Sequence, residues 1–262
     1  MLIPAFETIH AKGSFGDRLV PVHILGPKEK KNAAPLVILL HGVHGCADPE
    51  PGNKYGELAR MLSREGAWCA IVETSRIRRD RVTFCEDREA WAHSAFRGKT
   101  FAQDHADAVA GAETAAGEIT SENVWIFGFS LGGIHAILAS GVDKGFSFKP
   151  SGIALGGTGS FIRPEAASSL LLPILDTTPP KARLLESARN LRAGRLLSFY
   201  GSLDSTFSEE SCKEIVAAAS LPADRKNFIV IEGADHSFRT IKGLPTIKTL
   251  EIMVQVLSPL LI

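Results

Sequence analysis

The feature that most constrains the fold of this chain is a repeated alternation of short apolar runs with segments of helical spacing. Runs such as PLVILLHG and NVWIFGF are almost continuously apolar, which is typical of strands covered on both faces. The repeated strand-then-helix order favours a mainly parallel sheet with helices on both faces. In such sheets, ligands bind at the carboxyl ends of the strands. The expected strands are 19–25, 35–42, 67–74, 123–129, 151–157, 194–201 and 226–233, and the expected helices are 55–66, 101–119, 131–140, 208–220 and 244–261.

The first of these strands is expected to form a hairpin with the segment before it. Two stretches, near 76–100 and 158–193, interrupt the alternation. Both follow strand ends, so they could wall or cover a site and form a minimal cap; simple surface insertions are the alternative. Because no repeat or linker divides the chain, we expect a single domain over 1–262.

Composition limits the class of protein. With 262 residues, of which 45% are hydrophobic, the chain can bury a sizeable core. Lysine plus arginine and aspartate plus glutamate both number 29, and this zero net charge argues against nucleic-acid binding, which rewards a basic surface. No apolar stretch is long enough to span a bilayer, and segment 1–19 lacks the pattern of a signal peptide.

The four cysteines are Cys46, Cys69, Cys85 and Cys212. They form no CxxC pair and no ligand-like spacing with histidine, so we expect free thiols in a reducing compartment. The cytoplasm is therefore the expected location. Cys46 follows a glycine-rich segment but has no base partner, which makes it a weak nucleophile candidate.

The segment GFSLGG, from Gly128 to Gly133, raises the question of a nucleophilic serine. A Gly-x-Ser-x-Gly pattern is weak alone, but here it lies between an expected strand and an expected helix, as a nucleophile elbow requires. A serine in this turn has a strained backbone, so residues 128 and 132 must lack bulk where strand and helix approach. Gly133 adds room for close helix packing. We therefore expect Ser130 to be the nucleophile.

A serine hydroxyl needs a base, and the elbow motif predicts the chain order Ser, then Asp or Glu, then His. Asp204 follows the expected strand 194–201, and His236 follows the expected strand 226–233. Both would lie on the same sheet edge as Ser130.

Alternative residues for these two roles fit less well. His135 lies in the helix of the elbow and would point away, which leaves His236 as the one histidine downstream of it. Asp204 could instead cap the helix that follows, but Ser208 is an equally good cap. The other acids considered are Asp176, Asp224, Glu232 and Asp235.

The segment LLHGVHG also follows a strand, so its loop should lie at the same edge. The backbone N–H groups of Val43 and Leu131 are the expected oxyanion donors. A metal site at His41 and His44 is the alternative, but the loop lacks a nearby set of glutamates or cysteines.

The cluster RIRRDR, Arg76 to Arg81, has two interpretations: a solvated loop, or a site for a substrate carboxylate or phosphate. Trp91, Phe96 and Phe161 could line an acyl or alcohol pocket, or pack inside the insertions.

Together, HGVHG, GFSLGG, Asp204 after its strand and His236 in GADHSF resemble the α/β-hydrolase superfamily over most of the chain. The compact size and small insertions are similar to the branch of dienelactone hydrolases and prolyl oligopeptidases. The chain departs from dienelactone hydrolases in having Ser130 where they use cysteine. It departs from the HGGG lipases and esterases in having less glycine in the oxyanion loop.

The resemblance implies a mainly parallel eight-stranded sheet and the hydrolysis of esters or related acyl bonds. Ser130 would attack the acyl carbon, His236 would carry the proton, and Asp204 would orient the imidazole. The implied partner is a small, soluble ester, and no cofactor or metal is required. The same triad would serve a peptidase or a thioesterase, and a non-catalytic binder on this scaffold is a third alternative.

Overall fold

The computed structural model describes residues 5–27, 34–45, 47–84, 87–141, 145–167, 172–239 and 247–261. Within these ranges, eight strands form one sheet in the order β1-β2-β4-β3-β5-β6-β7-β8. The strands β2 and β1 pair antiparallel, as do β2 and β4, and all other neighbours are parallel. The strands are β1 Glu7–Lys12, β2 Leu19–Leu25, β3 Leu36–Leu40, β4 Trp68–Val72, β5 Val124–Phe129, β6 Gly152–Gly156, β7 Leu196–Gly201 and β8 Lys226–Ile231.

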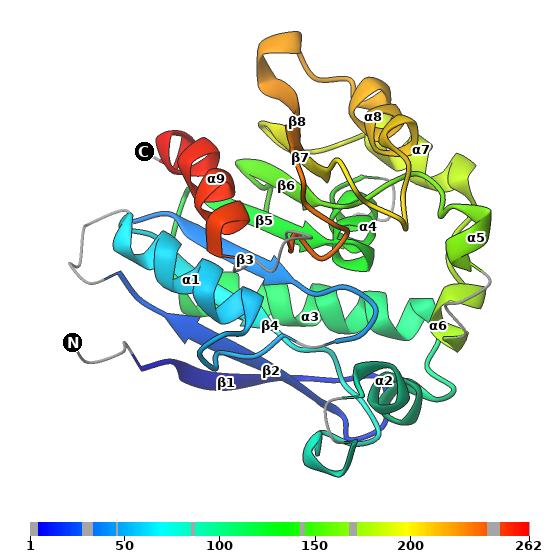
Figure 1. Cartoon of the computed structure of the whole chain (residues 1–262). Helices are drawn as coiled ribbons and strands as arrows, with labels where there is room; N and C mark the ends of the chain where they lie inside the picture. Colours follow the sequence, from blue (N-terminus) through cyan, green and yellow to red (C-terminus); the bar gives the residue numbers. More distant parts are fainter. Residues whose placement is uncertain are drawn as a thin grey trace.

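Helices cover both faces of the sheet (Figure 1). The helices α1 and α9 lie on one face, while α3, α4, α7 and α8 lie on the other. The helices are α1 Lys54–Arg64, α2 Arg88–Phe96, α3 Phe101–Glu118, α4 Leu131–Ser140, α5 Pro164–Ala167, α6 Pro173–Asp176, α7 Lys181–Arg189, α8 Glu209–Ala218 and α9 Ile247–Leu257, with short 3-10 turns at Val82–Phe84, Ala223–Arg225 and Ser258–Leu260.

The continuous apolar runs are explained by this two-sided burial. In β3, Leu36, Ile38 and Leu40 belong to the core beneath α3 and α4, whereas Val37 and Leu39 belong to the core beneath α1 and α9. Successive side chains of a strand point to opposite faces, so a strand between two helical layers needs apolar residues at every position. The predicted mainly parallel sheet and the predicted hairpin of β1 with β2 are both confirmed.

Local signals start the helices close to the expected positions. Asn53 caps α1 by accepting a hydrogen bond from the Tyr55 N–H, and Thr100 forms a capping box with Gln103 at the start of α3. Ser208 caps α8, which leaves Asp204 free of that role. No helix in the described ranges combines the length and the apolar character needed to cross a membrane.

Candidate active site

Ser130 lies in a strained turn between β5 and α4. Its φ of 52° and ψ of −115° fall in a region that non-glycine residues rarely adopt. Two contacts from the end of β6 hold this backbone: the Ser130 N–H donates to the Gly156 carbonyl at 2.8 Å, and the Thr158 hydroxyl donates to the Ser130 carbonyl at 3.0 Å. The turn therefore projects the serine side chain from the carboxyl edge of the sheet.

The glycines around Ser130 have the steric role expected of them. A Cβ atom on Gly128 would lie 2.3 Å from the Gly132 carbonyl oxygen, and one on Gly132 would lie 2.4 Å from the Leu40 carbonyl oxygen. A Cβ atom on Gly133 would lie 2.1 Å from the Thr158 hydroxyl oxygen. Strand, turn and helix thus approach each other more closely than any side chain would allow.

The structure brings Ser130, His236 and Asp204 together in one chain of hydrogen bonds. His236 Nε2 is 3.1 Å from Ser130 Oγ, and His236 Nδ1 is 2.9 Å from Asp204 Oδ2. Asp204 Oδ1 accepts hydrogen bonds from the N–H groups of Thr206 and Phe207 at 2.7 and 2.9 Å. Because an ionised carboxylate only accepts, the proton of a neutral His236 lies on Nδ1, which leaves Nε2 free to accept from the serine.

The space for these hydrogen-bonded side chains depends on a further glycine. Gly157 follows β6 with a φ of +57°, and a Cβ atom there would lie 3.2 Å from His236 Nδ1 and 3.3 Å from Asp204 Oδ2. The ring of Phe207 packs at 5.6 Å, centroid to centroid, from the ring of His236. These neighbours restrict where the imidazole can lie.

The alternative residues lie elsewhere. His135 Nε2 contacts the buried carboxylate of Asp104 at 2.8 Å rather than a member of the triad. The carboxylate that contacts His236 in the described part of the chain belongs to Asp204. The other acids have different surroundings: Asp235 binds Arg239, while Asp176 and Glu232 are exposed and Asp224 lies in the turn before β8.

The loop after β3 lies against the elbow, since a Cβ atom on Gly42 would be 3.3 Å from Ser130 Cβ. The Gly42 N–H donates to the Tyr55 hydroxyl at 3.2 Å, and the Gly42 carbonyl accepts from His41 Nδ1 at 2.8 Å and from the Gly45 N–H at 3.0 Å. The Gly42–Val43 peptide is therefore fixed through its carbonyl.

Two N–H groups are left available at this point. Within the described residues, the N–H groups of Val43 and Leu131 make no hydrogen bond. Leu131 is the first residue of α4, where an N–H has no acceptor inside the helix. Both residues line the cavity that contains Ser130.

His41 supports this loop in its neutral form. Burial lowers the pKa of His41 to about 4, and the nearby Asp104 carboxylate offsets only part of that effect. Its Nδ1–H donates to Gly42, and Nε2 accepts from the Thr74 N–H at 3.1 Å. No group of three or more His, Cys, Asp or Glu side chains in the described ranges is arranged to hold a metal ion.

Two arginines of the cluster RIRRDR are held by other groups of the chain, whereas Arg78 is half-exposed. Arg76 is buried and donates to the carbonyls of Thr74 and Gly45 at 3.1 and 3.0 Å. Arg79 contacts the carboxylates of Asp17 and Glu73, so it too is paired within the chain. Within the described part of 76–100, no residue lines the cavity at Ser130.

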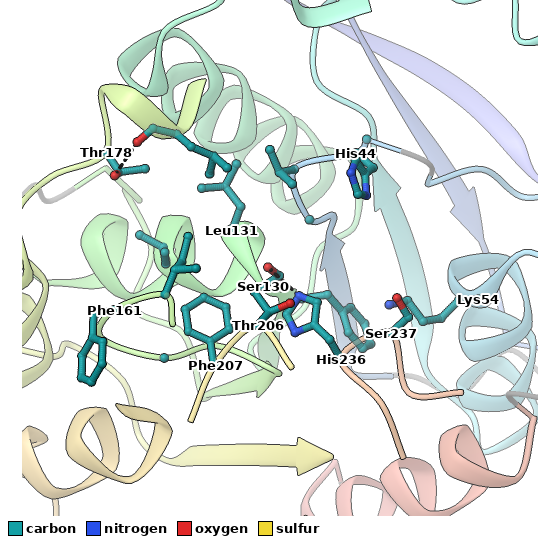
Figure 2. Close-up of a pocket in the computed structure, with 18 of the residues that line it drawn as sticks. His44, Lys54, Ser130, Leu131, Phe161, Thr178, Thr206, Phe207, His236 and Ser237 are labelled. Carbon is teal, nitrogen blue, oxygen red and sulfur yellow. Dashed lines mark hydrogen bonds between the residues drawn. The ribbon is translucent and has the colours of Figure 1, made fainter. Parts of the chain in front are cut away.

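A cavity of about 540 Å³ opens at the carboxyl edge of the sheet (Figure 2). Ser130 and His236 lie at its centre, with Phe161, Phe207 and Thr178 on one side in this view and His44, Lys54 and Ser237 on the other. The stretch 158–193 contributes many of the residues that line the cavity, including Phe161 and Leu184. Trp91 and Phe96, by contrast, are buried in the core. Cys46, Cys85 and residues 168–171 lie outside the described residues.

Three residues that shape the site were not singled out in the sequence, and a fourth, Arg76, was noted only as part of the cluster RIRRDR. Tyr55 and Arg76 hold the loop after β3, Thr158 holds the elbow, and Lys54 places a charge in the cavity. A tyrosine and a lysine at the start of a helix carry no distinctive pattern, and their role depends on distant segments. The position of Thr158 directly after a strand end was the one signal available.

Comparison with solved structures finds this architecture in hydrolases. An α/β serine hydrolase homologue from Coxiella burnetii is 19% identical, with a TM-score of 0.65 over 98% of this chain and 100% of that one. Esterase 2 of Thermogutta terrifontis, phosphonylated by sarin, is 17% identical, with a TM-score of 0.66 over 99% of this chain and 96% of that one. The esterase domain of a Rhodothermus marinus protein is 16% identical, with a TM-score of 0.60 over 97% of this chain and 98% of that one.

No family model matches the chain, and no curated protein matches it. At these identities the likeness concerns the fold. The chain has the α/β-hydrolase fold, with esterases and other hydrolases as its structural neighbours, and the fold that the sequence resemblance implied is confirmed.

Proposed function

We propose that this protein is a serine hydrolase that cleaves carboxylic esters of small substrates through an acyl-enzyme intermediate. The observation that carries the proposal is the unbroken hydrogen-bond chain Asp204–His236–Ser130 at the centre of a cavity. A hydroxyl is a poor nucleophile by itself, and a neutral imidazole positioned at its oxygen is the base that it needs.

In the first half of the reaction, Ser130 Oγ attacks the acyl carbon while His236 Nε2 takes its proton. The imidazole then carries a positive charge, which the buried Asp204 carboxylate at 2.9 Å stabilises. His236 passes the proton to the leaving alcohol as the tetrahedral intermediate collapses, and the acyl group stays on the serine. Water, activated by the same imidazole, releases the acid and restores Ser130.

The negative charge of the intermediate needs fixed donors, and the N–H groups of Val43 and Leu131 fill this role. They are unpaired within the described residues and border the same cavity as Ser130. The Gly42 N–H is less suitable, because it already donates to Tyr55. Each donor of this kind contributes about 3 kcal/mol to transition-state stabilisation.

The structural neighbours named above favour an ester over other acyl substrates. Two of them are esterases, and one of these forms an adduct with the organophosphonate sarin.

Cys69 and Cys212 are buried free thiols, which fits the cytoplasm as the location. Burial raises the pKa of Cys212 to about 12, so this thiol is no competitor for the nucleophile.

Replacing the nucleophile tests the proposal. Ser130→Ala is expected to lower kcat/KM on short-chain 4-nitrophenyl esters about 10⁴-fold or more, since the base then has no hydroxyl to activate. Parallel assays with acyl-thioesters and aminoacyl amides would identify a thioesterase or a peptidase.

A fluorophosphonate probe supplies the control. It should label the parent protein at Ser130 and leave the Ala variant unlabelled. If the folded parent neither reacts with the probe nor hydrolyses any of these substrates, the protein is a binder and the proposal is wrong.

A further inference from the structure

Part of the cavity at Ser130 has walls that come from α4, from α6 with the turn after it, and from α7. We call this part the inner pocket, and the residues that line it are Leu131, Ile134, Leu175, Thr178 and Leu184. Its four apolar side chains all belong to the core beneath α3 and α4 or pack against that core. Because α4 begins directly after Ser130, this apolar wall starts at the serine and continues along the helix.

Ile134 is the residue of α4 that the rest of the protein leaves partly uncovered. The other nine residues of this ten-residue helix are buried, whereas Ile134 is only partly buried and packs against the core. It lies one turn beyond Ser130, about 5.4 Å along the helix axis. Leu175 on α6 is partly buried in the same way. An apolar ligand would remove this remaining apolar surface from water, which favours its binding.

The end of the inner pocket away from the serine is closed by α7. Leu184 on this helix is only 3% exposed. One turn further on, α7 touches the end of α4, because a Cβ atom on Gly141 would lie 2.5 Å from the Ser187 carbonyl oxygen. The turn after α6 is tied to the start of α3, where the Phe101 N–H donates to the Thr177 hydroxyl at 2.7 Å. These anchored walls limit the length of a group that enters from Ser130.

The polar side chains at the inner pocket are bound to other groups of the protein. The Thr178 hydroxyl donates to the Leu175 carbonyl at 2.8 Å. Lys181, at the start of α7, pairs with Glu214 at 2.7 Å and lies 4.8 Å from the centre of the exposed Phe161 ring. A polar ligand group would lose its hydrogen bonds to water at these walls, so the inner pocket favours an apolar one.

The position of His236 determines which part of an ester enters the inner pocket. In the proposed mechanism, His236 Nε2 gives its proton to the leaving alcohol, so the alcohol must extend toward this histidine. Figure 2 places Leu131 and Thr178 on the opposite side of Ser130 from His236. The acyl chain leaves the carbonyl carbon in the other direction, which is the direction of the inner pocket.

We propose that the inner pocket binds the acyl chain of the substrate, that Ile134 and Leu175 limit its length, and that the preferred substrates are esters of unbranched acids about as long as hexanoate. This inference rests on the proposed hydrolase function. A hexanoyl chain spans the helical turn of about 5.4 Å between Ser130 and Ile134 and covers the apolar side chains there. An acetyl group is too short to do so.

Two series of esters test which group enters the inner pocket. The 4-nitrophenyl esters of acetate, hexanoate and decanoate vary the acyl group, whereas ethyl acetate and hexyl acetate vary the alcohol. The acyl ratio is kcat/KM for the hexanoate divided by that for the acetate, and the alcohol ratio compares hexyl with ethyl acetate. The parent should have an acyl ratio well above about tenfold, since each methylene moved from water into an apolar site contributes about fourfold.

Ile134→Trp should lower the acyl ratio about tenfold or more, because the indole fills the space next to the serine. Leu175→Trp should have the same effect from α6, which is separate from the elbow. Ile134→Ala should raise the ratio of decanoate to hexanoate, because a smaller side chain leaves room for a longer acyl chain. Ile252→Trp is the matched control: it alters an exposed isoleucine of α9 outside the cavity lining and should leave both ratios unchanged.

An acyl ratio that stays at the parent value in both Ile134→Trp and Leu175→Trp would overturn the proposal, as would an equal loss in Ile252→Trp. A fall confined to the alcohol ratio would also overturn it, since the alcohol would then occupy the inner pocket. These results would leave the hydrolase function intact, because that function depends on the Ser130 requirement with any ester. A parent that cleaves neither series lacks the proposed function itself, so the two failures are distinguishable.

Discussion

At the scale of single residues, Asp204 is the most rigidly held member of the candidate triad. Its side chain is fully buried, with one carboxylate oxygen fixed by two backbone N–H groups and the other by His236. This arrangement sets the tautomer of the imidazole as well as its position. An ionised carboxylate only accepts hydrogen bonds, so the ring nitrogen that faces it must carry a proton.

Asp204→Asn should therefore lower kcat by about 10³- to 10⁴-fold while leaving the fold intact. The amide oxygen of Asn would keep the bonds from the Thr206 and Phe207 N–H groups, so its NH₂ would face His236. The imidazole would then carry its proton on Nε2 and could not accept from Ser130. Steady-state kinetics of the purified variant measure this loss.

Asp235→Asn is the matched control, since Asp235 adjoins His236 in sequence but pairs with Arg239. It should retain kcat within a few-fold. A comparable loss in both variants would contradict the assignment of Asp204 as the acid partner.

The sequence predicted Ser130, Asp204 and His236 as the candidate triad because each follows an apolar strand, and parallel strands end at one edge. The same reasoning could not identify Lys54 or Tyr55. They lie at the start of a helix, and their contacts with Phe129 and Gly42 depend on how α1 packs over the sheet.

At the scale of elements, Arg76 clamps the loop after β3 through a hydrogen bond to the Gly45 carbonyl. The guanidinium group lies over the rings of Trp91 and Phe96, at 5.3 and 5.2 Å, and it donates to the carbonyls of Thr74 and Gly45. Gly45 closes the turn that begins at Gly42. The helix α2 and the loop after β4 thus fix the backbone that presents Val43.

Arg76→Lys should weaken this clamp, because an ammonium group cannot reproduce the planar set of donors. We expect kcat to fall about ten- to hundredfold with a smaller change in KM, since a displaced oxyanion donor affects the transition state more than the bound ester. The rate is measured per active site, with a fluorophosphonate titration to count folded, reactive protein.

Arg78→Lys serves as the control, because Arg78 is half-exposed and pairs with Asp80 at 3.3 Å. It should change neither constant. A lower melting temperature for Arg76→Lys with an unaltered rate per titrated site would show that Arg76 serves stability alone.

The alternating elements themselves were predictable, since burial on both faces demands apolar strands and the spacing of the helices follows from a period of 3.6 residues. The clamp was not. Four arginines in six residues have the charge pattern of a solvated loop, and only the packed structure shows that Arg76 is enclosed by aromatic rings and carbonyl groups.

At the scale of the whole molecule, several ionisable groups are buried, Glu73 and His41 among them. Burial alone would raise the pKa of Glu73, but the hydrogen bond from His23 and the charges of Arg76 and Arg79 outweigh it and lower that pKa to about 2. Such a carboxylate stabilises the fold above its unfolded pKa, near 4.5, and loses that contribution as the pH falls toward 2.

His41 acts in a different pH range. Its pKa is about 4 in the fold and about 6.5 in the unfolded chain, so the unfolded state binds a proton first as the pH falls. The free energy of unfolding should therefore decrease between pH 6.5 and pH 4, by about 3 kcal/mol from this residue alone. Asp104, Arg76 and Lys99 are the charged groups around it.

His41→Asn should remove this part of the pH dependence. Urea denaturation at several pH values between 4 and 6.5 would show a shallower slope for the variant, with other histidines cancelling in the difference. Parallel slopes for parent and variant would mean that His41 titrates normally in the fold.

The mainly parallel pairing of the strands could be predicted from the sequence, but their order in the sheet could not. Which strands lie side by side, such as β4 and β3, depends on how the crossover connections pack. The antiparallel strand β2 pairs with β4 rather than with β3. The lining of the cavity likewise depends on residues 158–193, whose short helices carry weak individual signals.

Under the proposed mechanism, the sheet order also determines when Ser130 can first become reactive. Ser130 follows β5, whereas its base is 106 residues later and follows β8, the strand at the sheet edge. In a partly folded chain in which β8 has not joined β7, His236 would not reach Ser130, and the serine would be an ordinary, unreactive alcohol. Reactivity at Ser130 would therefore require β8 to be in place, so a covalent inhibitor added during refolding would report when this edge strand has joined the sheet.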